Sequence, residues 1–109
     1  MPNAQRGFVI RIPDDDLDNL SRRLSATRWP KAIDGVGWDE GTDVGWLREL
    51  CTYWAEGFDW RARERYLNGF NHRMHGIDGL DVHFIHERGR GPDPIPLLLT
   101  HGWPSTFYE

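Results

Sequence analysis

Four consecutive residues near the end of the sequence form its most specific chemical pattern, His101-Gly102-Trp103-Pro104. They follow a continuous apolar run at residues 96–100, which is typical of a strand covered on both faces. A loop after such a strand can direct backbone N–H groups into a site, and Pro104 suits the first position of a helix. We therefore expect a loop over residues 101–104 and the first turn of a helix over residues 105–109. An ordinary strand-to-helix turn is the alternative interpretation.

Four of the five histidines lie in segments with strand character and invite a metal-site interpretation. A spacing of three residues within a strand places His72 and His75 on opposite faces, and it does the same for His83 and His86. The only cysteine, Cys51, lies on the apolar face of an expected helix, and no acidic residue stands as an obvious third ligand. We expect neither a metal nor a cofactor, and we interpret the histidines as packing or surface residues.

The elements that must position the loop begin with a helix over residues 14–27. Its first turn holds Asp14-Asp15-Asp16, and three leucines follow at helical spacing, at positions 17, 20 and 24. A calcium site is the other interpretation of the acidic run, but negative charge at a helix N-terminus explains it more simply. Trp29-Pro30 ends the helix, because the residue before a proline is pushed out of the α region.

Two further helices are expected before the strand pattern begins. Thr42 or Asp43 caps the second helix and Gly57 ends it. Its wide apolar face consists of Trp46, Leu47, Leu50, Cys51, Tyr53 and Trp54. Asp59 caps a third, shorter helix over residues 60–69.

The remaining pattern is extended. Residues 8–12 form a short extended segment, and residues 73–77 form a strand that Asp78-Gly79 joins to a half-buried strand over residues 80–87. The apolar run at residues 96–100 is expected to be a third strand. A strand covered on both faces requires layers that 109 residues do not supply, so this part of the chain indicates an incomplete sheet.

Composition narrows the possible classes of protein. The chain has 109 residues, a net charge of −4 and scattered basic residues, which excludes a complete TIM barrel and argues against nucleic acid as a partner. One cysteine excludes an internal disulfide and a cysteine zinc cluster. The longest aliphatic stretch is far shorter than the roughly 20 residues that span a bilayer. We expect a soluble cytoplasmic protein without a membrane anchor.

Several ordered motifs resemble the N-terminal region of the microsomal-type epoxide hydrolases, members of the α/β-hydrolase superfamily. The resemblance covers nearly the whole chain, from Phe8 to Glu109, and matches the soluble bacterial forms of that family. It rests on Ile12-Pro13, Thr27-Arg28-Trp29-Pro30, Asp59-Trp60-Arg61, Leu67-Asn68, Ile77-Asp78-Gly79-Leu80, His83-Phe84-Ile85-His86 and Leu97-Leu98-Leu99-Thr100-His101-Gly102-Trp103-Pro104-Ser105.

The resemblance implies a reaction and a site. In this family an Asp nucleophile opens the epoxide and forms an alkyl-enzyme ester, which a His–acid pair hydrolyses, while two tyrosines of a cap domain hold the epoxide oxygen. The loop matching residues 101–104 gives the backbone N–H at Trp103 to the oxyanion hole, and the Trp103 indole lies beside the substrate pocket. His101, Gly102 and Pro104 set the geometry of the loop. Many members have Gly-Ser after the proline, where this chain has Ser105-Thr106.

The resemblance also predicts how the chain is organised. Residues 1–71 form a helical N-terminal segment, and residues 72–109 form the first strands and oxyanion loop of an α/β-hydrolase core. The fold class is an α+β segment of about three helices, a β-hairpin and a third strand from an incomplete α/β-hydrolase fold. No G-x-S-x-G or G-x-D-x-G elbow occurs in the sequence, so we expect no catalysis from residues 1–109 alone.

Three functions remain open on the sequence. The first is the N-terminal part of an epoxide hydrolase, with an epoxide as substrate and the rest of the hydrolase chain, or a second copy, as partner. The second is a catalytically dead interaction module that binds a partner through its unfinished sheet edge. The third is a small independent enzyme that uses the histidines.

Overall fold

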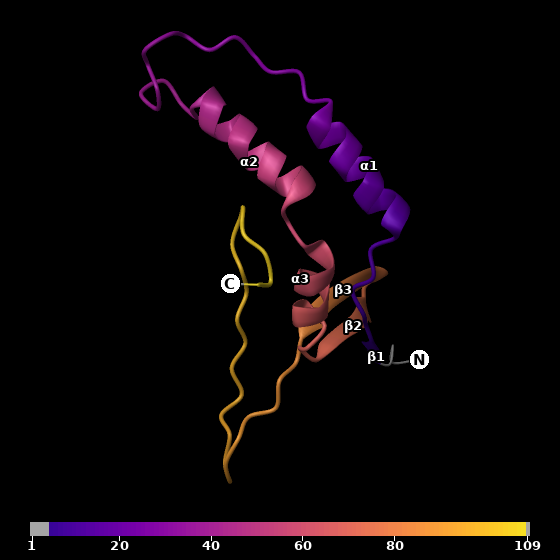
Figure 1. Cartoon of the computed structure of the whole chain (residues 1–109). Coiled ribbons are helices and arrows are strands. Elements are labelled where there is room, and N and C mark those ends of the chain that lie inside the picture. The colour runs from indigo at the N-terminus through magenta and orange to yellow at the C-terminus, as the bar shows by residue number, and fades with distance from the viewer. Residues whose placement is uncertain (1–4, 109) are drawn as a thin grey trace. The chain divides into compact units, whose positions relative to one another are not determined.

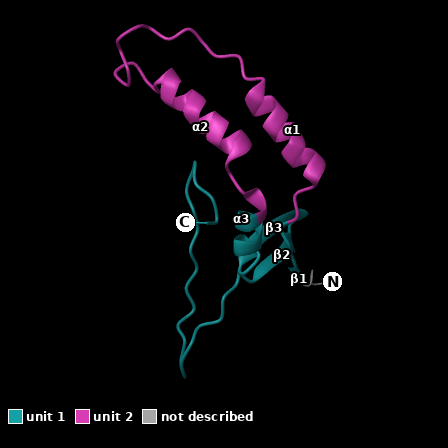
Figure 2. Cartoon of the chain, in the orientation of Figure 1, with its two compact units in different colours: residues 1–10, 62–109 teal, residues 11–61 magenta. Residues whose placement is uncertain are grey.

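Three helices and a three-stranded antiparallel sheet form the secondary structure of this computed structural model, which describes residues 5–108 (Figure 1). In chain order the elements are β1 (Arg6–Gly7), α1 (Asp14–Ser25), α2 (Val44–Glu56), α3 (Trp60–Leu67), β2 (His72–Ile77) and β3 (Leu80–Ile85). The chain divides into two compact units (Figure 2), residues 11–61 and residues 1–10 with 62–109. We call them the helical unit and the sheet unit.

Helix α1 of the helical unit begins and ends largely as its charges predict. Aspartates fill its first turn, and Arg22 and Arg23 lie in its last turn. The charges at both ends therefore interact favourably with the helix dipole. The helix ends at Ser25, two residues before the predicted end, where the N–H of Ala26 donates to the carbonyl of Arg22. The Ser21 hydroxyl donates to the carbonyl of Ala55 at 3.3 Å and so links α1 to α2.

Helix α2 has the two caps that the sequence predicts. The carboxylate of Asp43 accepts the N–H of Trp46 at 2.7 Å, which settles the choice between Thr42 and Asp43 as the cap. Gly57 follows the last residue of the helix, and its N–H donates to the carbonyl of Tyr53 at 2.7 Å. A Cβ at Gly57 would lie 2.9 Å from the Tyr53 ring, so this position also favours glycine for space.

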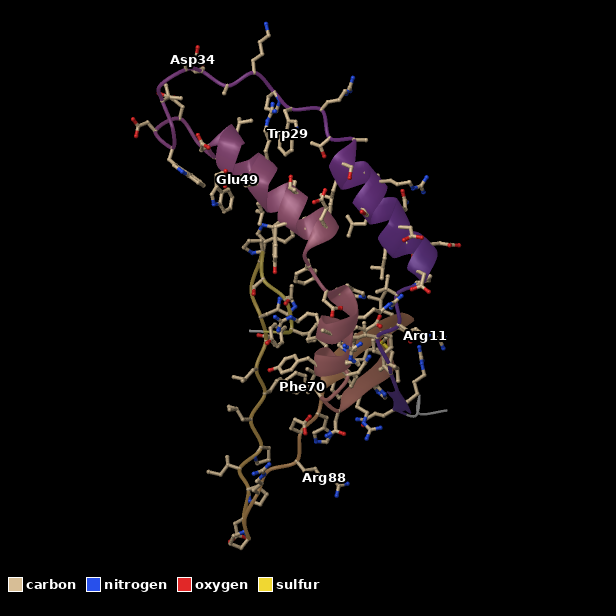
Figure 3. The ribbon with its side chains drawn as sticks, viewed as in Figure 1. Arg11, Trp29, Asp34, Glu49, Phe70 and Arg88 are labelled. Atoms are coloured by element: carbon tan, nitrogen blue, oxygen red, sulfur yellow. The ribbon has the colours of Figure 1, made fainter. Side chains whose placement is uncertain are left out.

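Several aromatic side chains of the helical unit pack around α2. Trp29, labelled in Figure 3, is half-buried, and the guanidinium of Arg48 lies 5.4 Å from its ring centroid. Trp38 meets Trp46 edge to face at 5.2 Å. These rings pack against one another and against Arg48, although Trp38 and Trp46 remain exposed.

The sheet unit is built around the β2–β3 hairpin, with β1 on the other side of β2. Asp78 and Gly79 have φ angles of 48° and 83°, as a two-residue hairpin turn of the I′ type requires. The turn fixes the register, which pairs Ile77 with Leu80 and His72 with Ile85. The predicted hairpin is therefore confirmed.

The extended segment after β1 is held by a side chain. Asn68 follows α3, and its amide accepts the N–H of Ile10 and donates to the carbonyl of Ile10, both at 2.8 Å. The N–H of Phe8 donates to the carbonyl of His72 at 3.3 Å. An ion pair between Arg6 and Asp81 lies across the sheet. Residues 6–10 are therefore held by β2 at one end and by Asn68 at the other.

Two predicted elements at the end of the chain are wrong. Residues 96–100 form no strand, because no other segment of residues 5–108 pairs with their backbone, and the third strand of the sheet is β1 instead. Residues 105–108 form no helix, and Glu109 lies outside the described residues. The Ser105 N–H donates to the Gly102 carbonyl at 2.7 Å, which closes a turn in place of the predicted helical start.

Burial is concentrated at the junction of α3 and β2. Within the described residues, only Leu67 and His72 are buried, His72 with 5% of its surface exposed. The outer end of the hairpin, including Ile77 and Leu80, is exposed, so β3 is half-buried only from His83 onward. Among the helices of residues 5–108, none combines the length and apolarity needed to cross a bilayer.

Candidate functional site

The four predicted site residues lie on one exposed loop of the sheet unit. A turn brings Gly102 and Ser105 together through the 2.7 Å hydrogen bond, and the Trp103–Pro104 peptide bond inside this turn is cis. His101 folds back on the loop, with its Nδ1 atom 3.4 Å from the Gly102 carbonyl. The Trp103 side chain is 99% exposed. The structure thus gathers the four residues in one turn but does not enclose them.

The backbone N–H of Trp103 is the chemically notable group of this loop. Within residues 5–108 it donates to no acceptor, whereas the neighbouring Gly102 carbonyl is already taken by Ser105. A donor that the fold leaves unpaired and exposed can bind an external acceptor without breaking an internal bond. The turn therefore leaves the Trp103 N–H, like the N–H groups of His101 and Gly102, free to donate to an external acceptor; that it serves an oxyanion hole stays a prediction.

An exposed apolar segment precedes the loop. Ile95, Leu97, Leu98 and Leu99 are all largely exposed, and Leu98 is 88% exposed. Several adjacent large aliphatic side chains in water mark a surface that another segment or chain covers. The predicted character of residues 96–100, apolar on both faces, is present, although the strand itself is not.

The segment after the loop is packed against the sheet by aromatic rings. Phe107 meets His83 at 4.9 Å and His72 at 5.8 Å, both edge to face. Phe8 lies against the same His83 ring, with the two centroids 4.9 Å apart. Nothing in the sequence singles out Phe107, because its contacts with residues far away in the chain depend on the path after the loop.

Tyr108 continues this packing on α3. Its ring meets Tyr66 at 6.0 Å and Phe70 at 6.5 Å, and Phe70 is labelled in Figure 3 just after α3. The Tyr108 side chain raises the pKa of Tyr66, chiefly by a hydrogen bond between the two phenols. Residues 107 and 108 therefore fasten the end of the loop to the hairpin and to α3, respectively.

Two histidines of the hairpin form a direct pair that the sequence analysis missed. His72 and His83 stack with their rings 5.1 Å apart, and Nδ1 of His72 lies 2.9 Å from Nε2 of His83. The residues are diagonal neighbours across the hairpin, since His72 opposes Ile85 and His83 opposes Met74. The prediction compared histidines only within each strand, whereas the two-residue turn already determines the diagonal pair.

Burial has different effects on two histidines of the hairpin, His83 and His75. Burial, followed by the nearby His72, lowers the pKa of His83. The Nδ1 atom of His75 is buried and has no hydrogen-bond partner in the described part of the chain. No group of three or more His, Cys, Asp or Glu side chains among residues 5–108 is arranged to hold a metal ion.

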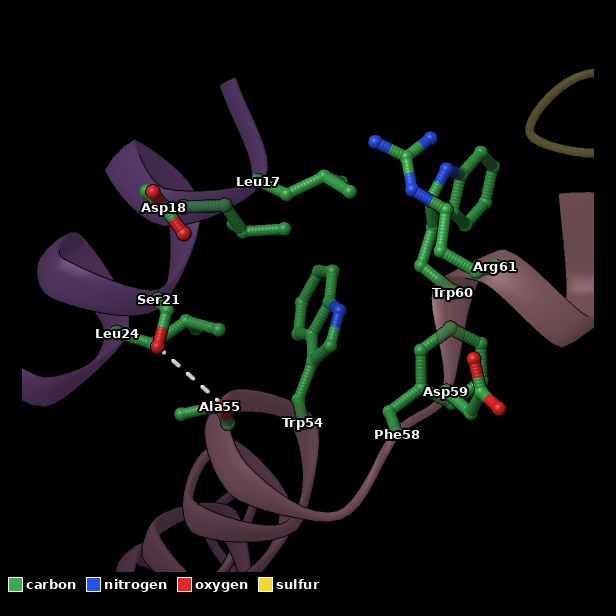
Figure 4. A pocket seen from close by; sticks show the side chains of 11 residues that line it. Leu17, Asp18, Ser21, Leu24, Trp54, Ala55, Phe58, Asp59, Trp60 and Arg61 are labelled. Atoms are coloured by element: carbon green, nitrogen blue, oxygen red, sulfur yellow. Dashed lines mark hydrogen bonds between the residues drawn. The ribbon is translucent and has the colours of Figure 1, made fainter. Parts of the chain in front are cut away.

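The helical unit contains an open groove of about 360 Å³ between α1, α2 and the start of α3. Figure 4 shows Trp54 projecting into it between Leu17 and Trp60, with the Ser21–Ala55 hydrogen bond at its side. An ion pair between Asp14 and Arg61 lies in the same unit. None of residues 101–104 is among the residues that line the groove.

Comparisons with known proteins find relatives along nearly the whole chain. The family described as Epoxide hydrolase N terminus matches residues 5–109. A Stigmatella aurantiaca protein, provisionally named an epoxide hydrolase, is 41% identical over 102 residues, covering 94% of this chain and 23% of the relative. Epoxide hydrolase 1 of Oryctolagus cuniculus is 32% identical over 108 residues, covering 95% of this chain and 24% of the relative.

A solved structure agrees in fold. An enantioselective mutant of the epoxide hydrolase from Aspergillus niger matches 96% of this chain with a TM-score of 0.81 and 32% identity. The match covers 27% of that structure, and the present chain spans about a quarter of the length of the curated relatives. The predicted fold class, an N-terminal segment of an α/β-hydrolase fold, is confirmed. By its sequence over residues 5–109 and by its fold, the chain belongs to the epoxide hydrolase N-terminus family.

Proposed function

We propose that this chain works as the N-terminal part of an epoxide hydrolase and that its loop at residues 101–104 gives one N–H, that of Trp103, to the oxyanion hole. The observation that carries the proposal is the Trp103 N–H, which has no acceptor within residues 5–108 although it lies in a closed turn. The match of the epoxide hydrolase N-terminus family across residues 5–109 supports it.

The reaction converts an epoxide to a vicinal diol in two steps. A carboxylate oxygen attacks an epoxide carbon, the carbon–oxygen bond of the ring breaks, and an acid donates a proton to the released oxygen. Water then loses a proton to a base and attacks the carbonyl carbon of the ester, which forms a tetrahedral oxyanion. When the oxyanion collapses, the diol leaves and the carboxylate is restored.

The part assigned to this chain is the second step. A fixed N–H donor stabilises the oxyanion more than it stabilises the ester carbonyl, and loss of one such donor slows catalysis by about 10²–10³-fold. The nucleophile, the His–acid pair and the two cap tyrosines are assigned to no residue of this sequence. We propose that another part of the hydrolase supplies them and that residues 1–109 do not catalyse the reaction alone.

The exposed segment before the loop is the proposed partner surface. Leu97, Leu98 and Leu99 are largely exposed, and their backbone has no strand partner within the described residues. A strand of the remaining hydrolase core is the proposed occupant, and the boundary between the helical segment (1–71) and the core strands (72–109) belongs to the same proposal. A second candidate function is that of an interaction module without activity. The exposed apolar surface is the one observation that favours it.

The test is an activity assay on the native polypeptide that carries this chain. The proposal predicts an intact mass about fourfold above 12.7 kDa, since this chain makes up 23–24% of the relatives, and diol formation from an aryl epoxide. Residues 1–109 alone should form no diol above the buffer rate. A native mass of 12.7 kDa without diol formation would overturn the proposal and favour the interaction module.

A further inference from the structure

We propose that Phe107 is a positioning residue for the Trp103 donor, because its ring seats the end of the loop on the paired imidazoles of His72 and His83. The inference rests on the proposed function, since it assigns the residue that fixes the direction of the same N–H. Phe107 touches no substrate in this proposal and acts only through the loop.

The surface under Phe107 includes a side chain that is held in place. His72 is 5% exposed, and both of its ring nitrogens are within hydrogen-bond distance of a partner, Leu67 and His83. An imidazole held at both nitrogens cannot rotate without losing a bond. The Phe107 ring meets both imidazoles at interplanar angles of 87° and 74°, so it rests on His72 and on the His83 ring that is bonded to it.

The connection from Phe107 to the donor is short and bonded. Only Pro104, Ser105 and Thr106 separate Phe107 from Trp103, and the half-buried Ser105 is tied back to Gly102 by the 2.7 Å hydrogen bond. Tyr108 adds a second fastening against Tyr66. Rotation of the turn would therefore require the Phe107 ring to leave the imidazoles.

The other side of the loop offers no comparable support. Residues 95–99 are exposed and pair with no strand in the described part of the chain. The loop is thus held mainly from its C-terminal side, and the loss of one ring there should affect the turn more than it affects the hairpin. A merely structural Phe107 would instead change the stability of the whole sheet unit.

The first test measures the order of the loop by amide hydrogen exchange in the 109-residue chain. Phe107→Ala should speed exchange of the Ser105 N–H by about fivefold or more, as expected for losing two aromatic edge contacts. Phe107→Tyr should restore the slow exchange. Phe58→Ala is the matched control, because Phe58 is 36% exposed against 39% for Phe107 and lies in the helical unit.

Exchange of the hairpin amides over residues 72–85 shows whether each variant still folds. If Phe107→Ala loses the hairpin, Phe107→Leu is measured in its place, because leucine keeps apolar volume without a ring edge. Faster Ser105 exchange with an unchanged hairpin supports the inference. Unchanged Ser105 exchange in a folded variant overturns it.

The second test uses the native epoxide-hydrolysing polypeptide. Phe107→Ala should lower kcat about tenfold or more with little change in KM for an aryl epoxide, because displacement of a catalytic group by about 1 Å costs up to 10²-fold. Phe107→Tyr should recover kcat. A rise in KM with unchanged kcat would contradict a positioning role.

The two proposals fail in different ways. If Trp103→Pro leaves ester hydrolysis unchanged while Phe107→Ala still speeds Ser105 exchange, the donor assignment is wrong. Phe107 then orders the loop but positions no catalytic donor. If Trp103→Pro slows ester hydrolysis while Phe107→Ala changes neither Ser105 exchange nor kcat, the donor assignment stands and the positioning role is overturned.

Discussion

The Nδ1 atom of His72 lies 2.9 Å from Nε2 of His83, while Nε2 of His72 lies 2.7 Å from the carbonyl oxygen of Leu67. A carbonyl can only accept, so Nε2 of His72 carries the proton and donates to Leu67. Nδ1 of His72 then accepts the proton that Nε2 of His83 donates. This assignment places one proton between the two facing nitrogens.

The burial of His83 predicts that the sheet unit loses stability as the solution becomes acidic. Burial and then the nearby His72 lower the pKa of His83 from its ordinary value of 6.5. The unfolded chain therefore binds the proton more readily than the folded chain, and stability rises with pH. The full contribution is present above pH 6.5 and is lost as the pH falls through the lowered pKa.

The measurement is the urea midpoint at pH 7.5, 6.5 and 5.5. His83→Gln keeps a donor for His72 but cannot titrate, so its midpoint should fall less between pH 6.5 and pH 5.5 than that of the unaltered chain. His101→Gln is the control, because His101 is exposed. If the urea midpoint falls equally with pH in the unaltered chain and in His83→Gln, the predicted role of His83 is wrong.

This histidine pair shows both what the sequence determines and where the prediction fell short. Asp78-Gly79 indicated a two-residue hairpin turn, and the structure confirms it. That turn fixes the register, so the diagonal approach of His72 and His83 was accessible from the sequence. The comparison of histidines within single strands missed it, because neighbours on a sheet lie across strands as well as along them.

A second prediction concerns Asn68, whose amide makes both of its hydrogen bonds to the backbone of Ile10. Asn68→Ala would leave the partly buried N–H and carbonyl of Ile10 without partners. Such groups cost about 1–3 kcal/mol when unsatisfied. The variant should therefore lower the free energy of unfolding by an amount in that range, measured by urea denaturation.

Asn71 provides the matched control for Asn68. Its side chain donates to Glu87 at 2.7 Å, but both residues are exposed. Water replaces an exposed hydrogen bond at little cost, so Asn71→Ala should change the free energy of unfolding by less than about 1 kcal/mol. Similar losses for the two variants would show that the Asn68 bonds do not hold the segment before α1.

A third prediction addresses the exposed segment at residues 95–99. The isolated 109-residue chain should self-associate through it, because adjacent leucines in water favour burial against a second copy. Leu98→Lys should shift the chain toward monomer in sedimentation velocity over a range of concentrations. Ile33→Lys, at another exposed aliphatic residue, should leave the association unchanged. A monodisperse monomer without either substitution would contradict this role of the segment.

Residues 96–100 also explain why the secondary structure at the end of the chain was predicted least well. The helices are determined by local signals, such as the Asp43 cap and the Gly57 stop of α2. A strand, in contrast, exists only when another strand accepts its hydrogen bonds, and residues 96–100 have no such neighbour in the described part of the chain. Local apolar character could not show whether that neighbour was present.

The candidate site was likewise predictable from the sequence only in part. The sequence located the loop at residues 101–104 because its residue types form a local pattern. It did not locate Phe107, because the contact with His72 and His83 joins segments more than twenty residues apart.

The central claim is tested most directly by the lifetime of the alkyl-enzyme ester in the native polypeptide. Trp103→Pro removes the N–H donor, whereas Trp103→Phe keeps the donor and changes only the side chain. After mixing with an aryl epoxide, intact-mass measurements over time should show the ester accumulating in Trp103→Pro, with hydrolysis about 10²–10³-fold slower. Trp103→Phe should hydrolyse the ester close to the unaltered rate. Equal ester lifetimes in Trp103→Pro and the unaltered protein would contradict the assignment of Trp103 as an oxyanion donor.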